Sequence, residues 1–84
     1  MEYLRTNRFK KAYRRLSSRD QARVEKALRQ FDEDRKHPSL HLEKITGSVW
    51  SIRASDSIRI TLEFDKNATV LRNVDTQHTI YGNP

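Results

Sequence analysis

The segment from Glu43 to Phe64 most constrains the fold, because apolar and polar side chains alternate along two runs joined by a short polar link. Alternate side chains of a strand point to opposite faces of a sheet. The apolar set comprises Trp50, Ile52, Ala54, Ile58, Ile60, Leu62 and Phe64. The complementary set comprises Ser51, Arg53, Arg59, Thr61 and Glu63. The pattern therefore predicts an antiparallel hairpin, turning at residues 54–57, with one core face and one face that carries two arginines.

Two helices are predicted before this hairpin. Thr6 or Asn7 is suited to cap the first helix, and Ser18 with Gln21 fits a capping box at the start of the second. Pro38 disfavours helix before it, so the second helix is expected to end near Arg35. The apolar residues of both helices recur at helical spacing: Phe9, Ala12, Tyr13 and Leu16, then Ala22, Val24, Ala27, Leu28 and Phe31. Together they predict a short antiparallel helical hairpin.

Further strands are expected on both sides of the central hairpin. Residues 2–5 form a candidate edge strand, alternation resumes at Ser39 with Leu40 and Leu42, and Thr69 to Val74 forms the last strand before a polar tail. Helices followed by strands indicate an α+β fold. We expect a single domain, residues 1–84, with two N-terminal helices packed on one side of a twisted antiparallel sheet of about four strands.

The charge distribution indicates a polyanionic partner. The chain has 17 Lys and Arg against 11 Asp and Glu, a net charge of +6. Residues 5–29 alone contain ten basic side chains and two acidic ones, a density that favours phosphate binding. A solvated helical surface, or a docking site for an acidic protein, explains the same density equally well.

Several classes of protein are disfavoured by the composition. There is no cysteine, which excludes disulfides and cysteine-based zinc sites and is consistent with a reducing cytoplasm. No apolar run approaches a membrane span and no leader is evident, so a cytoplasmic protein without membrane association is expected. The histidines, His37, His41 and His78, lack a spacing typical of metal ligands. No metal or other cofactor is predicted.

The candidate site residues come from the sheet and the tail. Arg53 and Arg59, on one face of adjacent strands, are placed to hold one phosphate between them, although ion pairs with Glu63 or Asp56 are the alternative. His78 suits acid–base chemistry near neutrality and Tyr81 suits stacking or hydrogen bonding, if the tail folds over the sheet. Lys44 at the sheet rim and His41, off the core, are weaker candidates for substrate binding. Trp50 is interpreted as core.

Four segments together resemble the RelE/ParE superfamily of toxins from bacterial and archaeal toxin–antitoxin modules. They are H-P-S-L-H at 37–41, K-I-T-G-S-V-W-S-I-R at 44–53, I-R-I-T at 58–61 and L-R-N-V-D-T-Q-H-T-I-Y at 71–81. The resemblance spans nearly the whole chain. For the RelE branch it implies a ribosome-dependent endonuclease that cleaves mRNA by 2′-hydroxyl attack and that a cognate antitoxin inhibits, in a toxin–antitoxin hetero-oligomer.

The resemblance also assigns roles. It implies that Arg59 stabilises the phosphate, that Arg53 is a basic residue of the preceding strand and that Tyr81 is the near-terminal tyrosine of the family. Ser51 stands at a second basic position, and an ungapped match puts Gln77, rather than His78, at the functional histidine or arginine. Two alternatives stay open. A ParE-like gyrase poison shares the same fold, and the departures at Ser51 and Gln77 motivate a decayed toxin that serves only as an antitoxin partner.

Overall fold

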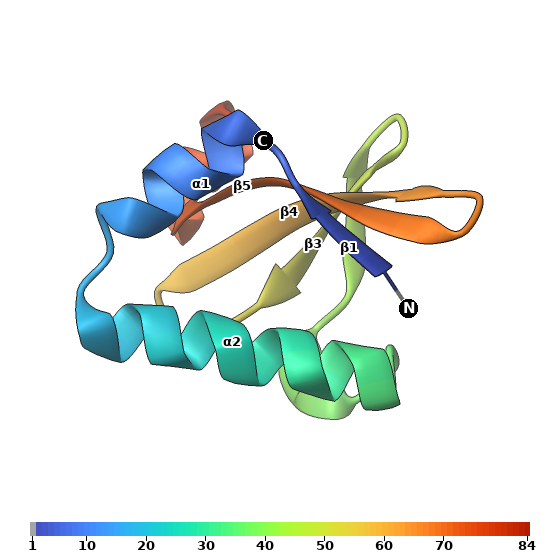
Figure 1. Cartoon of the computed structure of the whole chain (residues 1–84), viewed down its shortest axis with the longest axis horizontal. Coiled ribbons are helices and arrows are strands. Elements are labelled where there is room, and N and C mark those ends of the chain that lie inside the picture. Colours follow the sequence, from blue (N-terminus) through green and yellow to red (C-terminus); the bar gives the residue numbers. More distant parts are fainter. Residues whose placement is uncertain (1) are drawn as a thin grey trace.

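A computed structural model of the chain describes residues 2–84 and has an α+β architecture, as the sequence predicted. A five-stranded sheet with the order β1-β5-β4-β3-β2 runs through it (Figure 1). The elements are β1 (Glu2–Arg5), α1 (Asn7–Arg14), α2 (Ser18–Glu33), the 3₁₀ helix η1 (Pro38–Leu40), β2 (Glu43–Thr46), β3 (Val49–Arg53), β4 (Ile58–Asp65), β5 (Ala68–Thr76) and α3 (Gln77–Gly82). Four strands pair antiparallel, whereas β1 pairs parallel to β5, so the sheet is mixed and has one strand more than expected.

The two N-terminal helices begin at side-chain caps. The Thr6 hydroxyl accepts a hydrogen bond from the Phe9 amide at 3.1 Å, which confirms the first of the two predicted caps. Ser17, one residue before the predicted Ser18, caps α2 by accepting from the Asp20 amide. The helix ends at Glu33, slightly before the expected Arg35, because Asp34 already has an extended backbone.

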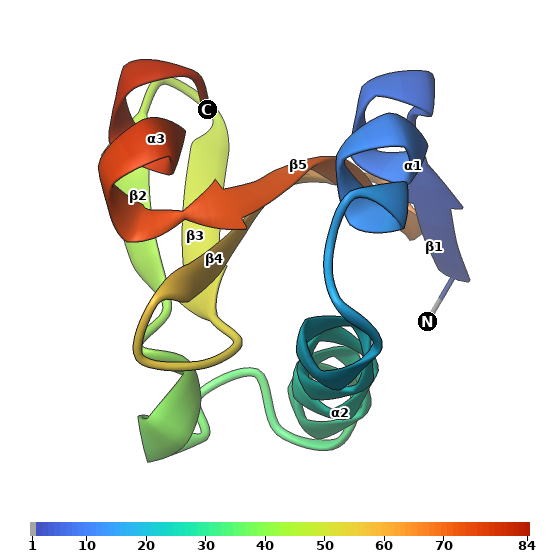
Figure 2. The ribbon, with the colours of Figure 1, turned by 90° about the vertical axis from the view of Figure 1, so that its left-hand side faces the viewer.

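Both helices contribute to one hydrophobic core. Figure 2 shows α2 end-on below the sheet, with α1 beside β1 and β5. The fully buried side chains of this core come from both helices, η1 and the three longest strands; the largest are Phe9, Val24, Phe31, Leu40, Ile52, Ile60, Leu62, Leu71 and Val74. Trp50 packs against this cluster, with its ring edge-on to Phe64 at 6.1 Å, in line with its interpretation as core.

The tail forms the helix α3 rather than an irregular polar segment. Thr76 caps it, and its Ile80 is fully buried. Helix α3 and the residues after it cover the sheet face opposite the main core: the Thr61 hydroxyl donates to the Pro84 carbonyl at 2.7 Å, and the Asn73 side chain donates to the Asn83 carbonyl at 2.9 Å. Ser51 and Thr61 are therefore buried, although their place in the alternation predicted a solvent-exposed face.

The segment predicted as a strand from Ser39 is instead a 3₁₀ turn. The ring of His37 accepts a hydrogen bond from the Ser39 amide, Pro38 occupies the first turn, and His41 adopts a left-handed backbone with φ of 45°. Leu40 is buried by this turn. As a result β2 begins only at Glu43 and lies at the edge of the sheet.

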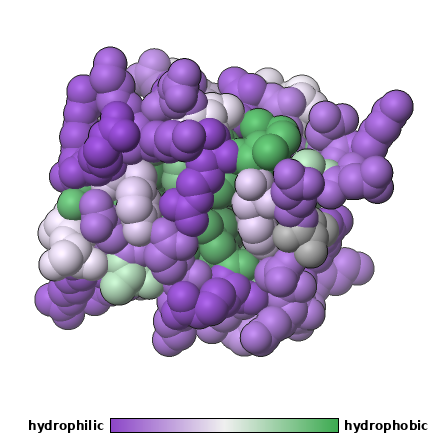
Figure 3. All heavy atoms as spheres, viewed as in Figure 1, coloured by the Kyte–Doolittle hydropathy of each residue, from purple (hydrophilic) through white to green (hydrophobic). Residues whose placement is uncertain are grey.

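The surface is dominated by charged and polar side chains. Figure 3 shows one face of the molecule, on which hydrophilic residues surround small hydrophobic patches. Within residues 2–84, no helix has the length and apolar character required to cross a bilayer.

Candidate functional site

Arg59 is held in place by the turn between β3 and β4. Its Nη1 donates to the carbonyl oxygens of Ser55 at 2.7 Å and of Asp56 and Ile58 at 3.2 Å. The turn itself is fixed, because the Ala54 amide donates to the Ile58 carbonyl and the Ile58 amide donates to the Ser55 hydroxyl. A guanidinium bound to main-chain carbonyls keeps one orientation, which is what recognition of an anion requires.

The charge of Arg59 also lacks a neutralising partner. Among residues 2–84, no carboxylate lies within ion-pair distance of its guanidinium, whereas Arg53 pairs with Asp56 and Arg72 pairs with Glu63. The oxygen of a neutral amide, Gln77 Oε1, accepts from Arg59 Nη2 at 3.2 Å. Arg59 is half-buried, so its charge is less screened than that of a fully exposed side chain. This position therefore favours a bound anion.

Helix α3 brings the tail residues to the same end of the sheet. The backbone N–H of Gln77 donates to the Ser57 carbonyl at 2.8 Å, which joins the start of α3 to the turn that holds Arg59. One helical turn later, the Tyr81 hydroxyl donates to the carboxylate of Glu43 on β2. That hydrogen bond is the main cause that raises the pKa of Tyr81 above its ordinary value, with smaller opposing effects from Arg59 and Gln77. Tyr81 therefore carries its proton at neutral pH.

A shallow hollow of about 540 Å³ lies beside these groups. Its lining joins the turn to α3 and comprises Asp56, Ser57, Thr76, Gln77, His78 and Tyr81. His78 is exposed and Tyr81 is 44% exposed, so both rings are accessible to a ligand in the hollow. The structure thus brings together Gln77, His78 and Tyr81, with Arg59 next to them through Gln77.

Three other candidates lie elsewhere. Arg53 is the cross-strand partner of Arg59, but its guanidinium binds Asp56 and lines a different hollow, against α2. Lys44 is paired with Trp50 and so belongs to the core side of the sheet, opposite the face that carries Arg59. His41 is exposed between η1 and β2.

Glu43 is the functional candidate that sequence reasoning missed. Its Cα partner is Ser51, which places its side chain on the same face as Arg59. The contact with Tyr81 spans 38 positions in the chain, so local patterning gives no sign of it. The alternation beginning at Ser39 did place Glu43 opposite the leucines, and this was the available signal.

The arrangement is suited to chemistry on a phosphodiester. Arg59 offers a fixed cation for charge that develops on a phosphoryl oxygen. Glu43 offers a carboxylate, and Tyr81 and His78 offer groups able to donate a proton. Among residues 2–84, no group of three or more His, Cys, Asp or Glu side chains is placed to hold a metal ion.

Comparison with solved structures identifies the class of fold. The chain shares its fold with solved structures described as YoeB/ParE, RelE and YafQ proteins, and this is the fold that the resemblance in the sequence implied. No family model and no curated protein sequence matches the chain.

Three solved structures illustrate the similarity. YafQ from E. coli strain BL21(DE3) matches with a TM-score of 0.80 at 8% identity, covering 96% of this chain and 98% of its own. The YoeB/ParE toxin from Agrobacterium tumefaciens matches with a TM-score of 0.76 at 14% identity, covering 92% and 99%. A chain of the RelB-RelE antitoxin-toxin complex from Methanococcus jannaschii matches with a TM-score of 0.74 at 19% identity, covering 96% and 99%. At these identities the likeness concerns the fold.

Proposed function

We propose that the protein is the toxin of a type II toxin–antitoxin system and that it cleaves ribosome-bound mRNA. The observation that carries this proposal is the environment of Arg59, which main-chain carbonyls fix and no carboxylate among residues 2–84 neutralises. Tyr81, whose pKa Arg59 influences, forms a carboxylate–phenol pair with Glu43. A fold alone does not define a function, so the proposal rests on these side chains, and the toxins of the same fold add support.

The proposed reaction needs no group that the chain lacks. The 2′-hydroxyl of a ribose attacks the adjacent phosphorus as Glu43 takes its proton, and the bond from phosphorus to the 5′-oxygen of the next nucleotide breaks. His78 or Tyr81 gives a proton to that leaving oxygen. The products are a 2′,3′-cyclic phosphate and a free 5′-hydroxyl. Arg59 stabilises the negative charge that builds on the non-bridging oxygens in the transition state.

The proposed inhibitor is a cognate antitoxin. Acidic side chains on that protein complement the basic surface formed by residues 5–29 of this chain. A solved complex of the same fold, described as a RelB-RelE antitoxin-toxin complex, supports this partner.

Gln77 favours a second candidate function, that of a toxin without catalysis which binds only its antitoxin. The amide of Gln77 has no acid–base function, and its oxygen already accepts from Arg59. In this case the fixed guanidinium has a structural role in holding the β3–β4 turn to α3.

Expression of the wild type without an antitoxin tests the proposal. We expect growth arrest in which protein synthesis stops before DNA synthesis, and mRNA fragments that end in a cyclic phosphate. Arg59→Ala should abolish arrest and cleavage. Replication block with intact mRNA indicates a gyrase poison instead, and absence of any phenotype indicates the non-catalytic partner.

Two controls separate a lost site from a lost fold. Arg59→Lys keeps the charge but loses the planar fork, so cleavage should remain far below the wild-type rate. Lys66→Ala removes a cation from the exposed β4–β5 turn, at the other end of β4 from Arg59 (Figure 1), and should leave cleavage unchanged. Circular dichroism of each variant checks the fold. A fully active, folded Arg59→Ala protein would exclude this residue from the mechanism.

A further inference from the structure

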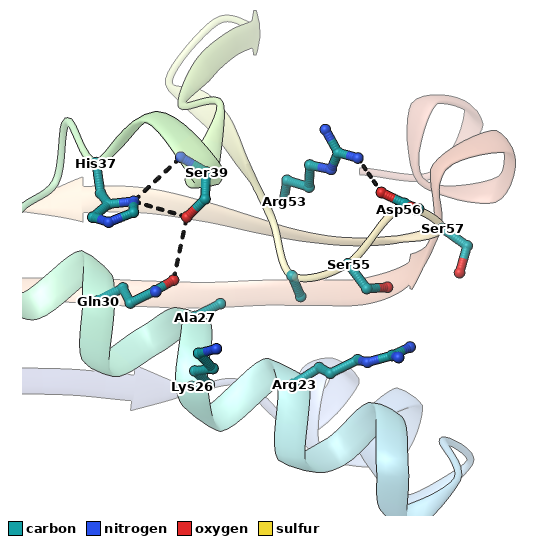
Figure 4. Close-up of a pocket in the computed structure, with 11 residues that line it drawn as sticks. Arg23, Lys26, Ala27, Gln30, His37, Ser39, Arg53, Ser55, Asp56 and Ser57 are labelled. Carbon is teal, nitrogen blue, oxygen red and sulfur yellow. Dashed lines mark hydrogen bonds and ion pairs between the residues drawn. The ribbon is translucent and has the colours of Figure 1, made fainter.

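A second hollow, on the other side of the β3–β4 turn from Gln77, His78 and Tyr81, lies between α2, η1 and that turn. Figure 4 shows its three sides: α2 with Arg23 and Lys26 below, His37 and Ser39 at one end, and the turn with Arg53 opposite. Its volume is about 600 Å³.

The charges that line this hollow are mainly positive. Arg23, Lys26 and Arg53 contribute cations, and Asp56 is the one carboxylate among the described lining residues. Asp56 pairs with Arg53. Arg23 forms a long ion pair with Asp20, with 3.6 Å between Nη1 and Oδ1. No carboxylate among residues 2–84 pairs with Lys26. The hollow therefore retains excess positive charge directed at a bound anion.

Polar groups, rather than apolar ones, form the rest of the lining. Ser39, Ser55, Ser57 and Gln30 surround the space, and apolar side chains are limited to Ala27 and Ala54 among the lining residues described. An acidic peptide segment anchors itself through large apolar side chains as well as charges, and this lining gives such anchors no surface. A sugar–phosphate backbone, which is polar throughout and anionic at regular intervals, matches it better.

One end of the hollow is already ordered. The Ser39 amide donates to His37 Nδ1 at 3.2 Å, and the Ser39 hydroxyl lies 2.8 Å from the same nitrogen and 3.4 Å from Gln30 Oε1 (Figure 4). Because Nδ1 accepts the backbone hydrogen bond, the neutral ring carries its proton on Nε2. His37 is therefore fixed as a hydrogen-bond donor without needing to be charged.

The β3–β4 turn connects this hollow with the candidate catalytic hollow. Asp56 and Ser57 line both spaces, so the two hollows lie on either side of a single turn. Arg53 and Arg59 leave the sheet at paired positions but serve different spaces, Arg53 the hollow against α2 and Arg59 the end of the sheet beside α3.

We propose that the hollow between α2 and the β3–β4 turn binds a second phosphate of the RNA strand whose scissile phosphate lies at Arg59. The inference rests on the proposed function in taking the ligand to be single-stranded RNA. Lys26 and Arg23 hold the phosphate from α2, and the strand crosses the turn at Ser57. The site fixes the direction of the strand relative to the reacting group.

The test uses a single-stranded RNA decamer made entirely of 2′-O-methyl nucleotides, which lacks the attacking hydroxyl and stays intact. Its dissociation constant is measured across a series of salt concentrations. Lys26→Gln should weaken binding about threefold to tenfold and lower the salt slope by about 0.7, the amount expected for one phosphate contact on a single strand. Lys66→Gln makes the same charge change in the β4–β5 turn and should alter neither value.

Backbone amide NMR of the wild type locates the contact. Addition of the decamer should shift the signals of Ser39 and Ser55 together with those of Gln77 and Tyr81. If the shifts remain confined to Gln77 and Tyr81 and Lys26→Gln binds normally, the second phosphate site is refuted while the proposed cleavage stands. If inorganic phosphate or a poly-glutamate peptide shifts Ser39 and the decamer does not, the site is likewise refuted.

The same variants separate failure of the second phosphate site from failure of the proposed function. Weaker decamer binding by Lys26→Gln and a shifted Ser39 signal would support the phosphate site. If Arg59→Ala still arrested growth in that case, the catalytic role of Arg59 would be refuted. If the wild type cleaves mRNA and Lys26→Gln binds the decamer with normal affinity, the proposed cleavage is supported and the second phosphate site is refuted.

Discussion

Two cationic regions of the molecule differ in how they hold their charge. The surface of α1 and α2 carries many exposed basic side chains. Lys10, Lys11 and Arg14 are examples that form no ion pair with any residue between 2 and 84, whereas Arg23 pairs with Asp20. At the end of the sheet a single guanidinium, that of Arg59, is fixed by four hydrogen bonds. Numerous mobile charges suit attraction of a polyanion, whereas one oriented charge suits a transition state. The two regions should therefore respond differently to substitution.

The largest effect of a substitution is expected on the cleavage rate, at the end of the sheet that carries Arg59. Tyr81→Phe removes one hydroxyl and its hydrogen bond to Glu43. Loss of a proton donor at the reacting group should slow cleavage about 100-fold, while the exposed position should keep the change in unfolding free energy below about 1 kcal/mol. The rate is measured on programmed ribosomes at saturating protein. An unchanged rate would restrict Tyr81 to a structural role.

A smaller effect is expected from loosening the helix that completes the site. Ile80→Ala empties a fully buried position beneath α3 and should cost about 2–4 kcal/mol of unfolding free energy. Ile80→Val is the matched control and should cost about 1 kcal/mol. Chemical denaturation measures both. If the basic surface of α1 and α2 binds RNA independently of α3, the Ile80→Ala protein should bind the decamer at low salt nearly as well as the wild type, as long as it remains folded.

Removing charge from α1 tests the opposite region. The double variant Lys10→Gln and Lys11→Gln should lower the salt slope of RNA binding by at most about 1.4 and weaken affinity severalfold. The cleavage rate at saturating protein should stay unchanged, because neither side chain lies near Arg59. A fall in that saturated rate would show that the helical surface also positions the substrate.

The smallest effect concerns Arg5, a basic residue near this surface that is held by an ion pair. Arg5 binds Glu25 at 2.8 Å and lies over the rings of Phe9 and Tyr13. Its hydrogen bond lowers the pKa of Glu25 below the ordinary value of 4.5. The stabilisation is therefore complete above about pH 4.5 and is lost as the pH falls through the lower, folded-state value.

Glu25→Gln should accordingly reduce the loss of unfolding free energy on acidification. Because both side chains are about one-third exposed, the difference at neutral pH should stay below about 1 kcal/mol. Urea denaturation between pH 3 and pH 7 measures it. Parallel pH curves for the wild type and the variant would show that the ion pair contributes nothing.

Local patterns predicted the parts of the fold that depend on local physics. The alternation from Trp50 to Phe64 gave the hairpin and its core face, and the cap at Thr6 gave the start of α1. The parallel pairing of β1 with β5 joins Glu2 to Ala68, and no local pattern encodes a partner so distant. The same limit explains why a polar tail was expected where α3 packs.

The candidate site was predicted in part. Arg59 was placed on the correct face, because period-two alternation fixes direction. The pattern did not predict that the guanidinium groups of Arg59 and Arg53 serve different spaces. That difference depends on side-chain contacts, because the carboxylate of Asp56 binds Arg53. Ser51 and Thr61 are buried, and Thr61 is in contact with Pro84 after α3, so their polarity misled the assignment of an exposed face.

The irregular edge strand β2 has a consequence for self-association. An exposed edge offers unpaired backbone groups to a second chain, and natural sheets guard such edges with charge and broken register. In β2 the register shifts between Lys44 and Thr46, and both Glu43 and Lys44 are exposed. The exposed charge of Lys44 and the shifted register of β2 therefore disfavour addition of a strand from a second chain at this edge, which limits aggregation.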